Sequence, residues 1–286
     1  MLLRLEKKSN RGYTPKMVKL ILSDLDGTLL HDDKTISKKS AEAFSFARKQ
    51  GVLIGFCTSR SRLNIKEYLE QVQTDFLIAN GGACVMVGTE CIYDCSFSLE
   101  ETRTLFDSIY RICGDDVEMT ADMRDALYWN RRKVDQHYVY ARESVYDDFR
   151  NFNEPAMKIC VHTWDDGKAL EIASVLGIDE VDFIKFSDIP WYKFSKKNAT
   201  KEKAIQRLSQ HLKIPVAEMA AFGDDFNDIG MLKMCGYGIA MQNAIEEVKL
   251  CASEVTLSNE ADGVAEWIYR HIGMSRKTED FRDAHQ

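Results

Sequence analysis

Buried-strand and helical patterns alternate over the first eighty residues. Near-continuous apolar runs at 18–26, 52–59 and 75–80 predict strands that are buried on both faces. Apolar positions at helical spacing predict helices between them, at 37–50 and 61–73. Strands that alternate with single helices predict right-handed crossovers and therefore a parallel sheet.

The pattern changes after the Asn-Gly-Gly sequence at 80–82. Residues 84–98 favour a hairpin, and a capping-box sequence starts a predicted helix over 99–112. Further strands are predicted near 117–121, 126–130, 156–163, 181–187 and 191–195, with a helix at 167–176. This region is rich in short strands, and we predict that it is a largely antiparallel α+β domain.

Strand and helix alternate again from about Thr200. The expected helices are 201–212, 227–235, 244–252 and 261–272, and the expected strands are 218–224, 237–241 and 254–258. We therefore predict an α/β fold, with a doubly wound parallel-sheet core formed by two separate pieces of chain. The predicted ranges are 17–83 and 196–273 for the core, 84–195 for an inserted α+β domain, and 1–16 and 274–286 for terminal extensions.

The composition narrows the class of protein. With 38 basic and 45 acidic side chains the formal net charge is −7, which argues against nucleic acid or an anionic membrane as a partner. An anionic small substrate stays open, because a bound cation can supply positive charge locally. No run approaches the roughly 18 apolar residues of a membrane span. The eight cysteines form no CxxC pair, so we expect a cytoplasmic protein without structural zinc.

Polar residues of types common in catalytic and metal-binding sites follow three of the predicted parallel strands. Asp24 and Asp26 end the first strand, Thr58 ends the second, and Asp224 ends a later one. Ligands of open α/β sheets bind beyond the carboxyl ends of the strands, so the three ends predict one shared site. Residues two apart along a strand end point to the same side, roughly 6.5–7 Å apart, so the first two aspartates repel unless a cation or proton intervenes. The alternative is a polar turn that caps a helix.

The segment Gly-Asp-Asp-Phe-Asn-Asp at 223–228 adds three acids within five residues. Like charges at this spacing destabilise a helix and need a counter-ion. Oxygen-only ligands suit a hard cation such as Mg²⁺, although an acidic first turn of a solvated helix is the alternative. The Thr58 hydroxyl is suited either to bind a phosphate or to form a hydrogen bond with a local backbone group. Lys201 lies in a first helical turn, where the helix dipole disfavours a cation, and it is either an anion ligand or part of a basic surface.

The order of these motifs resembles the haloacid dehalogenase (HAD) superfamily. DLDGT, a threonine that ends the second strand, an insertion, a lysine and GDxxND follow one another as in that family. The chain looks most like the Cof-type phosphatases with a type IIB cap. The resemblance covers about 17–273, and it includes the Asn-Gly-Gly sequence, GDDFNDIGML, AMQNA at 240–244 and ADGVAEWI at 261–268.

The resemblance implies roles for the acidic residues. Asp24 matches the nucleophile that forms an aspartyl-phosphate, and Asp26 matches the general acid/base. Mg²⁺ is the implied cofactor. Its implied protein ligands are the Asp24 carboxylate, the backbone carbonyl of Asp26 and the Asp224 carboxylate.

Four further positions match residues around the transferring phosphoryl group. Thr58 and Lys201 match the groups that hold its oxygens, Asn227 matches a further polar contact, and Asp228 matches a supporting carboxylate. Two positions depart from the family pattern. Ser59 stands where a glycine is usual, and Glu202 stands where a glycine often follows the lysine. The second departure leaves Lys197 as the other candidate for the lysine.

The resemblance implies a Mg²⁺-dependent phosphatase that hydrolyses small phosphorylated metabolites, such as sugar phosphates. A phosphotransferase or phosphomutase of the same fold, and a catalytically silent ligand-binding scaffold, are the alternatives. The inserted domain, a cap in this architecture, is expected to select the leaving group. Its candidate contacts are Arg124, Trp129, Arg131, Arg132 and His137. The sequence predicts no oligomeric state.

Overall fold

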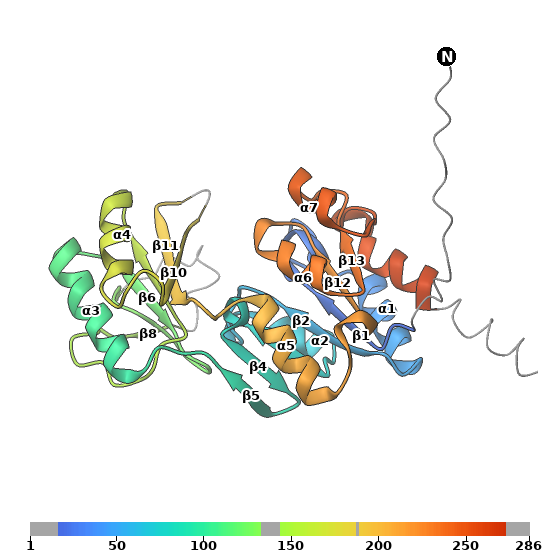
Figure 1. Cartoon of the computed structure of the whole chain (residues 1–286), viewed down its shortest axis with the longest axis horizontal. Helices are drawn as coiled ribbons and strands as arrows, with labels where there is room; N and C mark the ends of the chain where they lie inside the picture. Colours follow the sequence, from blue (N-terminus) through green and yellow to red (C-terminus); the bar gives the residue numbers. More distant parts are fainter. Residues whose placement is uncertain (1–16, 133–143, 187–188, 273–286) are drawn as a thin grey trace, which may run out of the picture.

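The structure is a computed structural model, and it describes residues 17–132, 144–186 and 189–272. Two sheets with their own helices lie next to each other along the long axis (Figure 1). The chain passes from the first sheet into the second and then returns to the first. The α/β class and the inserted second domain are as predicted.

Among the described residues, the first sheet has eight strands in the order β14-β13-β12-β1-β2-β3-β4-β5. Six of them run parallel to one another: β1 Leu20–Ser23, β2 Leu53–Cys57, β3 Phe76–Ala79, β12 Met219–Gly223, β13 Tyr237–Ala240 and β14 Glu254–Val255. From β1 the strand order proceeds in one direction to β3. After the insertion, it proceeds in the other direction from β12 to β14. This reversal makes the sheet doubly wound, and the reversal lies between β1 and β12.

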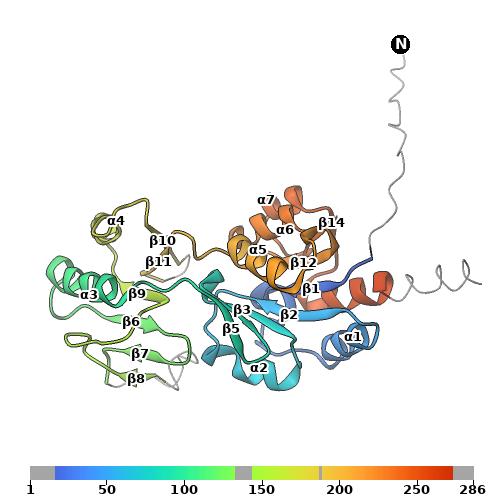
Figure 2. The same cartoon turned by 60° about the horizontal axis from the view of Figure 1, so that its bottom comes forward.

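Helices cover both faces of the first sheet (Figure 2). α5 and α6 pack on one face, while α1 and the helix at 263–272 lie on the other, joined by the rings of Phe46 and Tyr269 at 5.5 Å between centroids. Trp267 is fully buried there against the ring of Phe222. The bounds are α1 Lys38–Lys49, α2 Lys66–Gln71, α5 Lys201–Leu212, α6 Ile229–Met234 and α7 Glu246–Cys251.

The hairpin at the start of the insertion belongs to the first sheet. β4 Cys84–Val87 pairs antiparallel with β3, and β5 Glu90–Asp94 pairs with β4. The predicted boundary between residues 83 and 84 is therefore wrong, because the sheet continues to Asp94. A hairpin pattern predicts that its two strands pair with each other. It does not predict which sheet the first strand joins.

The second sheet has the order β10-β11-β9-β6-β7-β8 in the described part of the chain. Its pairs are antiparallel as expected, except that β7 and β8 are parallel. α3 and α4 cover one face over a second apolar core that extends from Phe97 to Phe194. The bounds are α3 Leu99–Cys113, β6 Met119–Asp122, β7 Leu127–Trp129, β8 Val145–Tyr146, β9 Lys158–His162, α4 Asp166–Ser174, β10 Val181–Lys185 and β11 Trp191–Lys196. We call this sheet and its two helices the cap.

Within the residues that the structure describes, no helix has the length and apolar character needed to span a membrane.

Candidate active site

Three neighbouring parallel strands end at one edge of the first sheet. β12, β1 and β2 lie side by side, and Asp24, Thr58 and Asp224 follow them directly. A cavity of about 240 Å³ opens there, beyond the carboxyl ends of the strands. It is lined by Asp24, Asp26, Gly27, Thr58, Ser59, Asp224, Asp225 and Asn227. The structure therefore brings the three predicted strand ends into one site, at the point where the strand order reverses.

The turn after β1 depends on Gly27. Its φ is +69°, a left-handed conformation that favours glycine. A Cβ there would lie only 2.1 Å from Oδ2 of Asp224, so the bare backbone lets that carboxylate come close. Thr28 donates its hydroxyl to the other oxygen, Oδ1 of Asp224, at 2.6 Å. The DLDGT segment thus fixes an acid that is distant in sequence.

Lys201 lies at the centre of the acidic cluster, with only 2% of its side chain exposed. Its Nζ is 3.0 Å from Oδ1 of Asp24 and 2.6 Å from Oδ1 of Asp228. The start of α5 comes this close because Gly82 has no side chain. A Cβ on Gly82 would lie 2.1 Å from the Thr200 carbonyl oxygen.

The other candidate lysine lies outside the cavity. The side chain of Lys197 is 55% exposed, and its Nζ is 3.7 Å from Oδ1 of Asp182. The large residue after Lys201 is accommodated by a glycine. A Cβ on Gly230 would overlap the Glu202 carboxylate, at 1.4 Å from Oε1. Glu202, which stands where the family often has glycine, is therefore accommodated because Gly230 on α6 has no side chain.

Asp228 is fully buried, and both of its oxygens are occupied. Oδ1 faces Lys201, and Oδ2 accepts the backbone N–H groups of Asp224 at 3.0 Å and of Asp225 at 3.2 Å. These contacts fix the loop that presents Asp224. Asp228 itself does not line the cavity, so its contacts act on Lys201 and on the loop of Asp224.

The carboxylates of Asp24, Asp224 and Asp228 are crowded, since one oxygen of each lies within 4.8 Å of the others. Burial, with the neighbouring carboxylates, raises the pKa of Asp24 to about 8, against the opposing effect of Lys201. Burial also raises the pKa of Asp224 to about 7, although the hydrogen bond from Thr28 lowers it. Lys201 alone does not balance three carboxylates. A hard divalent cation fits this all-oxygen set of donors.

Arg60 holds the Asp26 carboxylate, and the sequence interpretation gave Arg60 no role. Its Nε and Nη2 each donate to Asp26 at 2.7 Å, and Nζ of Lys34 lies 3.2 Å from the same carboxylate. Burial alone would raise the pKa of Asp26, but Arg60 and Lys34 lower it below the ordinary value. A general acid/base works best with a pKa near the working pH. The described arrangement instead holds Asp26 as a carboxylate, the form that accepts a proton.

The remaining predicted residues form the rim of the cavity. The Thr58 hydroxyl accepts a hydrogen bond from the Arg60 backbone N–H at 3.1 Å, so it also stabilises the turn after β2. The carboxamide of Asn227 donates to the Ser59 hydroxyl at 3.3 Å. The serine that departs from the family pattern therefore faces the cavity and links the ends of β2 and β12.

The cap residues suggested by the sequence have partners elsewhere. Arg124 pairs with Asp94, Arg131 and the Trp129 indole both reach Glu118, and the Arg132 guanidinium lies over the Tyr146 ring. His137 lies outside the described residues. None of the four described side chains lines the cavity.

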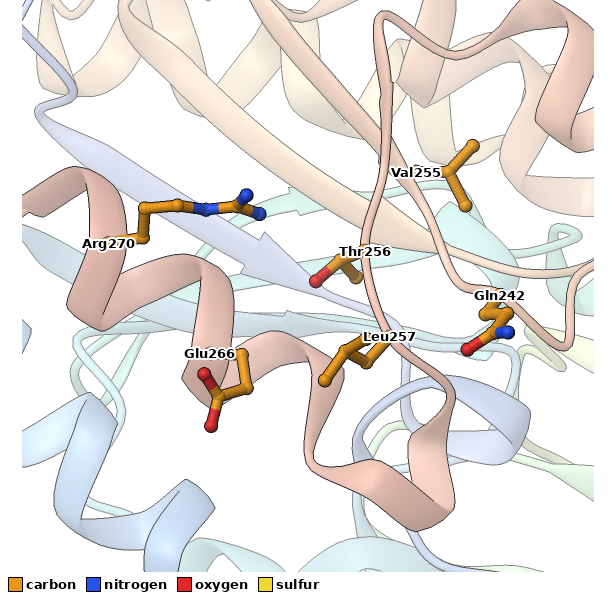
Figure 3. A pocket seen from close by; sticks show the side chains of 6 residues that line it. All are labelled: Gln242, Val255, Thr256, Leu257, Glu266 and Arg270. Atoms are coloured by element: carbon orange, nitrogen blue, oxygen red, sulfur yellow. The ribbon is translucent and has the colours of Figure 1, made fainter.

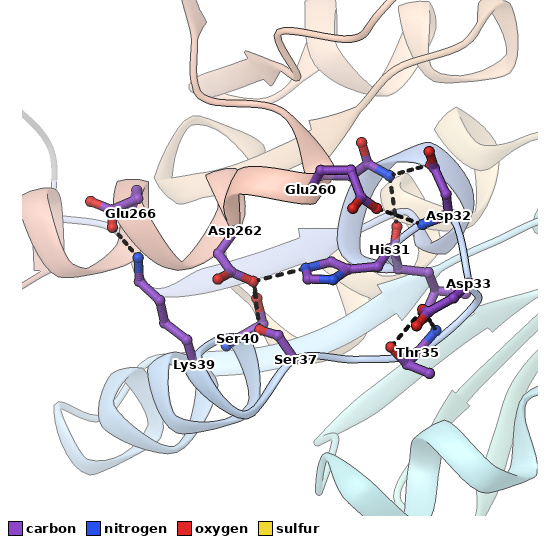
Figure 4. A network of polar contacts seen from close by, with 12 residues as sticks. His31, Asp32, Asp33, Thr35, Ser37, Lys39, Ser40, Glu260, Asp262 and Glu266 are labelled. Atoms are coloured by element: carbon purple, nitrogen blue, oxygen red, sulfur yellow. Dashed lines mark hydrogen bonds and ion pairs between the residues drawn. The ribbon is translucent and has the colours of Figure 1, made fainter.

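Polar side chains from the last part of the first sheet's chain hold the segment that follows the turn after β1. The Asn243 carboxamide donates to the Gly27 carbonyl at 2.7 Å. Asp262 accepts from Ser37 at 2.5 Å and contacts Nε2 of His31 at 3.1 Å (Figure 4). The AMQNA and ADG sequences thus hold the segment from Gly27 to Ser37, and sequence alone did not indicate this role.

A larger hollow of about 520 Å³ lies away from this chemistry (Figure 3). It borders β14 at the edge of the sheet. Its charged side chains are already paired, Arg270 with Glu254 at 3.1 Å and Glu266 with Lys39. The acidic cavity at the strand ends is therefore the better candidate for the reaction.

A doubly wound sheet, an acidic cluster with a buried lysine at its switch point, and an inserted cap together define a class of phosphoryl-transfer enzymes. The sequence pattern of the haloacid dehalogenase-like hydrolases matches residues 21–268. The chain belongs to this family. The predicted class of enzyme, a phosphoric monoester hydrolase, is confirmed.

Relatives and solved structures agree with this assignment. A Bacillus subtilis protein named 5-amino-6-(5-phospho-D-ribitylamino)uracil phosphatase YitU is 28% identical over 271 residues, which cover 89% of this chain and 98% of that protein. A putative phosphatase of Haemophilus influenzae is 30% identical and covers 87% and 96%. The crystal structure of TM0651 from Thermotoga maritima has a TM-score of 0.76 at 26% identity, with coverage of 89% and 97%. The structure of BT4131, titled a HAD subclass IIB sugar phosphatase, has a TM-score of 0.72 at 24% identity, with coverage of 90% and 99%, and so supports the fold alone.

Proposed function

We propose that the protein is a Mg²⁺-dependent phosphatase of small phosphorylated metabolites that acts through an aspartyl-phosphate at Asp24. One observation carries the proposal. Asp24 is buried at the end of β1 with its carboxylate 3.0 Å from the Lys201 ammonium, and it opens into a cavity that further acids line. This arrangement suits a carboxylate that attacks a phosphate dianion, which repels it unless positive charge lies nearby.

Asp24, Asp224 and the backbone carbonyl of Asp26 are the proposed ligands of Mg²⁺, which when bound supplies positive charge to the phosphoryl oxygens. Lys201 neutralises charge on the nucleophile side, while Thr58 and Asn227 orient the oxygens at the rim. Asp228 keeps Lys201 and the Asp224 loop in place. This division of roles assigns every carboxylate of the cluster a distinct task.

The proposed reaction has two in-line steps. In the first, an Asp24 oxygen forms a bond to phosphorus, the bond to the leaving oxygen breaks, and Asp26 gives that oxygen a proton. In the second, Asp26 takes a proton from water as the water oxygen attacks phosphorus, which frees Asp24 and releases phosphate. Arg60 keeps Asp26 ionised in the described arrangement. The first step therefore requires that Asp26 be protonated, either after it separates from Arg60 or while it stays in contact with it.

The names of the relatives indicate which substrates to test first. The name of BT4131 indicates sugar phosphates, and that of YitU indicates 5-amino-6-(5-phospho-D-ribitylamino)uracil. The test is release of phosphate from a panel of such esters, with p-nitrophenyl phosphate as a generic member. We expect turnover with Mg²⁺ and none with Asp24→Asn. Transfer of the phosphoryl group to an added alcohol, with no free phosphate, would instead support a phosphotransferase.

A further inference from the structure

The open face of the cap sheet carries lysines that point toward the candidate active site. Side chains alternate along β9 and β11, and Ile159, Val161 and Phe194 enter the core under α3 and α4. Lys158 and Lys193 therefore lie on the opposite face. Nζ of Lys158 is 3.4 Å from the Ser59 carbonyl oxygen, which shows that this face meets the loop after β2.

The Lys193 ammonium lies near the loop after β2 that borders the candidate cavity. A Cβ placed on Gly81 would lie 3.6 Å from Nζ of Lys193 and 3.9 Å from the Ser59 hydroxyl. Ser59 lines the cavity. The ammonium group thus lies over the bare backbone of Gly81, on the cap side of the site. Asp24 also lines the cavity, and the buried Lys201 ammonium lies 3.0 Å from its carboxylate.

The two cap lysines differ in their partners. Lys158 is buried and pairs with Asp122 at 3.0 Å. Across residues 17–132, 144–186 and 189–272, no hydrogen bond or ion pair reaches the Lys193 ammonium. Burial and the nearby Lys158 charge lower the pKa of Lys193, although Asp182 on β10 acts in the other direction. A bound anion would relieve this cost.

We propose that Lys193 is a specificity-determining residue, and that it binds an anionic group on the leaving alcohol of the substrate. This inference rests on the proposed phosphatase function. The favoured class is a phosphate monoester that carries a second negative group, either a carboxylate or another phosphate. The transferring phosphoryl group is not the ligand of Lys193, because that group must reach Asp24, beside Lys201.

The experiment uses substrate pairs that differ only in the second anion. Sorbitol 6-phosphate and 6-phosphogluconate form the carboxylate pair, and fructose 6-phosphate and fructose 1,6-bisphosphate form the phosphate pair. The proteins compared are the wild type, Lys193→Met, Lys193→Arg and the control Lys197→Met, which removes an exposed lysine at the end of the same strand. Values of kcat/KM are measured for both members of each pair.

We expect the wild type to prefer the anionic member of at least one pair. Lys193→Met should lower that preference about 10- to 100-fold, as expected for a lost hydrogen bond to a charged group. The esters without a second anion should change little. Lys193→Arg should keep much of the preference, and Lys197→Met should keep all of it. The pair that responds identifies the anion as a carboxylate or a phosphate.

A wild-type protein without preference in both pairs would overturn the inference, and so would an equal loss on both members in Lys193→Met. Calorimetry of the same ligands distinguishes a failure of the Lys193 inference from a failure of the proposed phosphatase function. If no ester, including p-nitrophenyl phosphate, is hydrolysed while the anionic ligands still bind more tightly through Lys193, the proposed reaction fails and the role of Lys193 stands.

Discussion

At the scale of single residues, the site depends on one buried positive charge among carboxylates. Lys201 contacts both Asp24 and Asp228, and all three side chains are buried. An ion pair of this kind is costly to break, because the fully buried Asp228 carboxylate would lose its counter-charge. We therefore expect the chemistry and the stability of the core domain to depend on the same two contacts.

Replacing Lys201 with methionine tests this dependence. We expect a loss of about 3–5 kcal/mol in the free energy of unfolding, together with loss of activity toward every ester. The measurement is urea unfolding alongside a phosphate-release assay. The control is Lys197→Met, which removes an exposed lysine and should change neither quantity much. Equal stability of the two variants would show that Lys201 does not compensate the buried acids.

The raised pKa values of Asp24 and Asp224 predict how stability depends on pH. In the metal-free fold these groups keep their protons up to about pH 8 and about pH 7, whereas in the unfolded chain they ionise near 3.8. The unfolded state therefore binds fewer protons across this window, and stability falls as the pH rises, by up to about 1.4 kcal/mol per pH unit for each group.

Urea unfolding in EDTA between pH 5 and pH 8 measures this effect. The slope should be shallower in Asp224→Asn, which cannot ionise at that position. Mg²⁺ binds the ionised form, so its affinity should increase over the same range. A metal-free wild type whose stability rises steadily over this range would contradict the assigned protonation states.

At the scale of elements, glycines set the close approaches that assemble the site. Gly82 has a φ of +107°, and a Cβ there would collide with the start of α5. Gly88 in the β4–β5 hairpin also has a positive φ, of +56°, but open space surrounds it. Both positions have a positive φ that disfavours a side chain, but only at Gly82 would a side chain meet another element.

This difference gives a matched pair of variants. Gly88→Ala should cost about 1 kcal/mol of stability through backbone strain and leave kcat nearly unchanged. Gly82→Ala should also shift α5 and Lys201, and a displacement of about 1 Å lowers turnover by about a hundredfold. Purified variants are compared by kcat and by thermal unfolding. Similar kcat values for the two would show that the approach of α5 to Gly82 does not set the position of Lys201.

The elements also show how far sequence predicts this molecule. The ends of β1, β2 and β12 could be placed together, because neighbouring parallel strands end at one edge of a sheet. The partner of the β4–β5 hairpin could not be predicted, since strand pairing between distant segments leaves no local pattern. The same limit applies to Arg60 and Asp26, which lie 34 positions apart and meet only in the fold.

At the scale of the whole molecule, we propose that one sheet carries out the reaction and the other selects the substrate. The first sheet carries the acidic cavity, and the cap brings Lys158 and Lys193 close to Ser59, which lines it. Arg131 was a sequence-based candidate for substrate contact, but it pairs with Glu118 within the cap. The residues that select the leaving group are therefore better sought on β9 and β11.

Removal of the metal should abolish turnover without unfolding the protein. We expect EDTA to stop phosphate release and Mg²⁺ to restore it, while Ca²⁺ restores little because its looser coordination misaligns the in-line attack. Activity is followed by phosphate release and folding by circular dichroism. Full activity after thorough chelation would exclude a catalytic metal at the acidic cluster.

The central claim is that Asp24 carries the phosphoryl group during turnover. Rapid acid quenching during hydrolysis, followed by digestion and mass spectrometry, detects an acyl-phosphate directly. We predict a phosphorylated peptide that contains Asp24 in the wild type and no such peptide in Asp24→Asn, which should also be inactive. Wild-type hydrolysis without phosphorylation of Asp24, together with an active Asp24→Asn variant, would contradict the account.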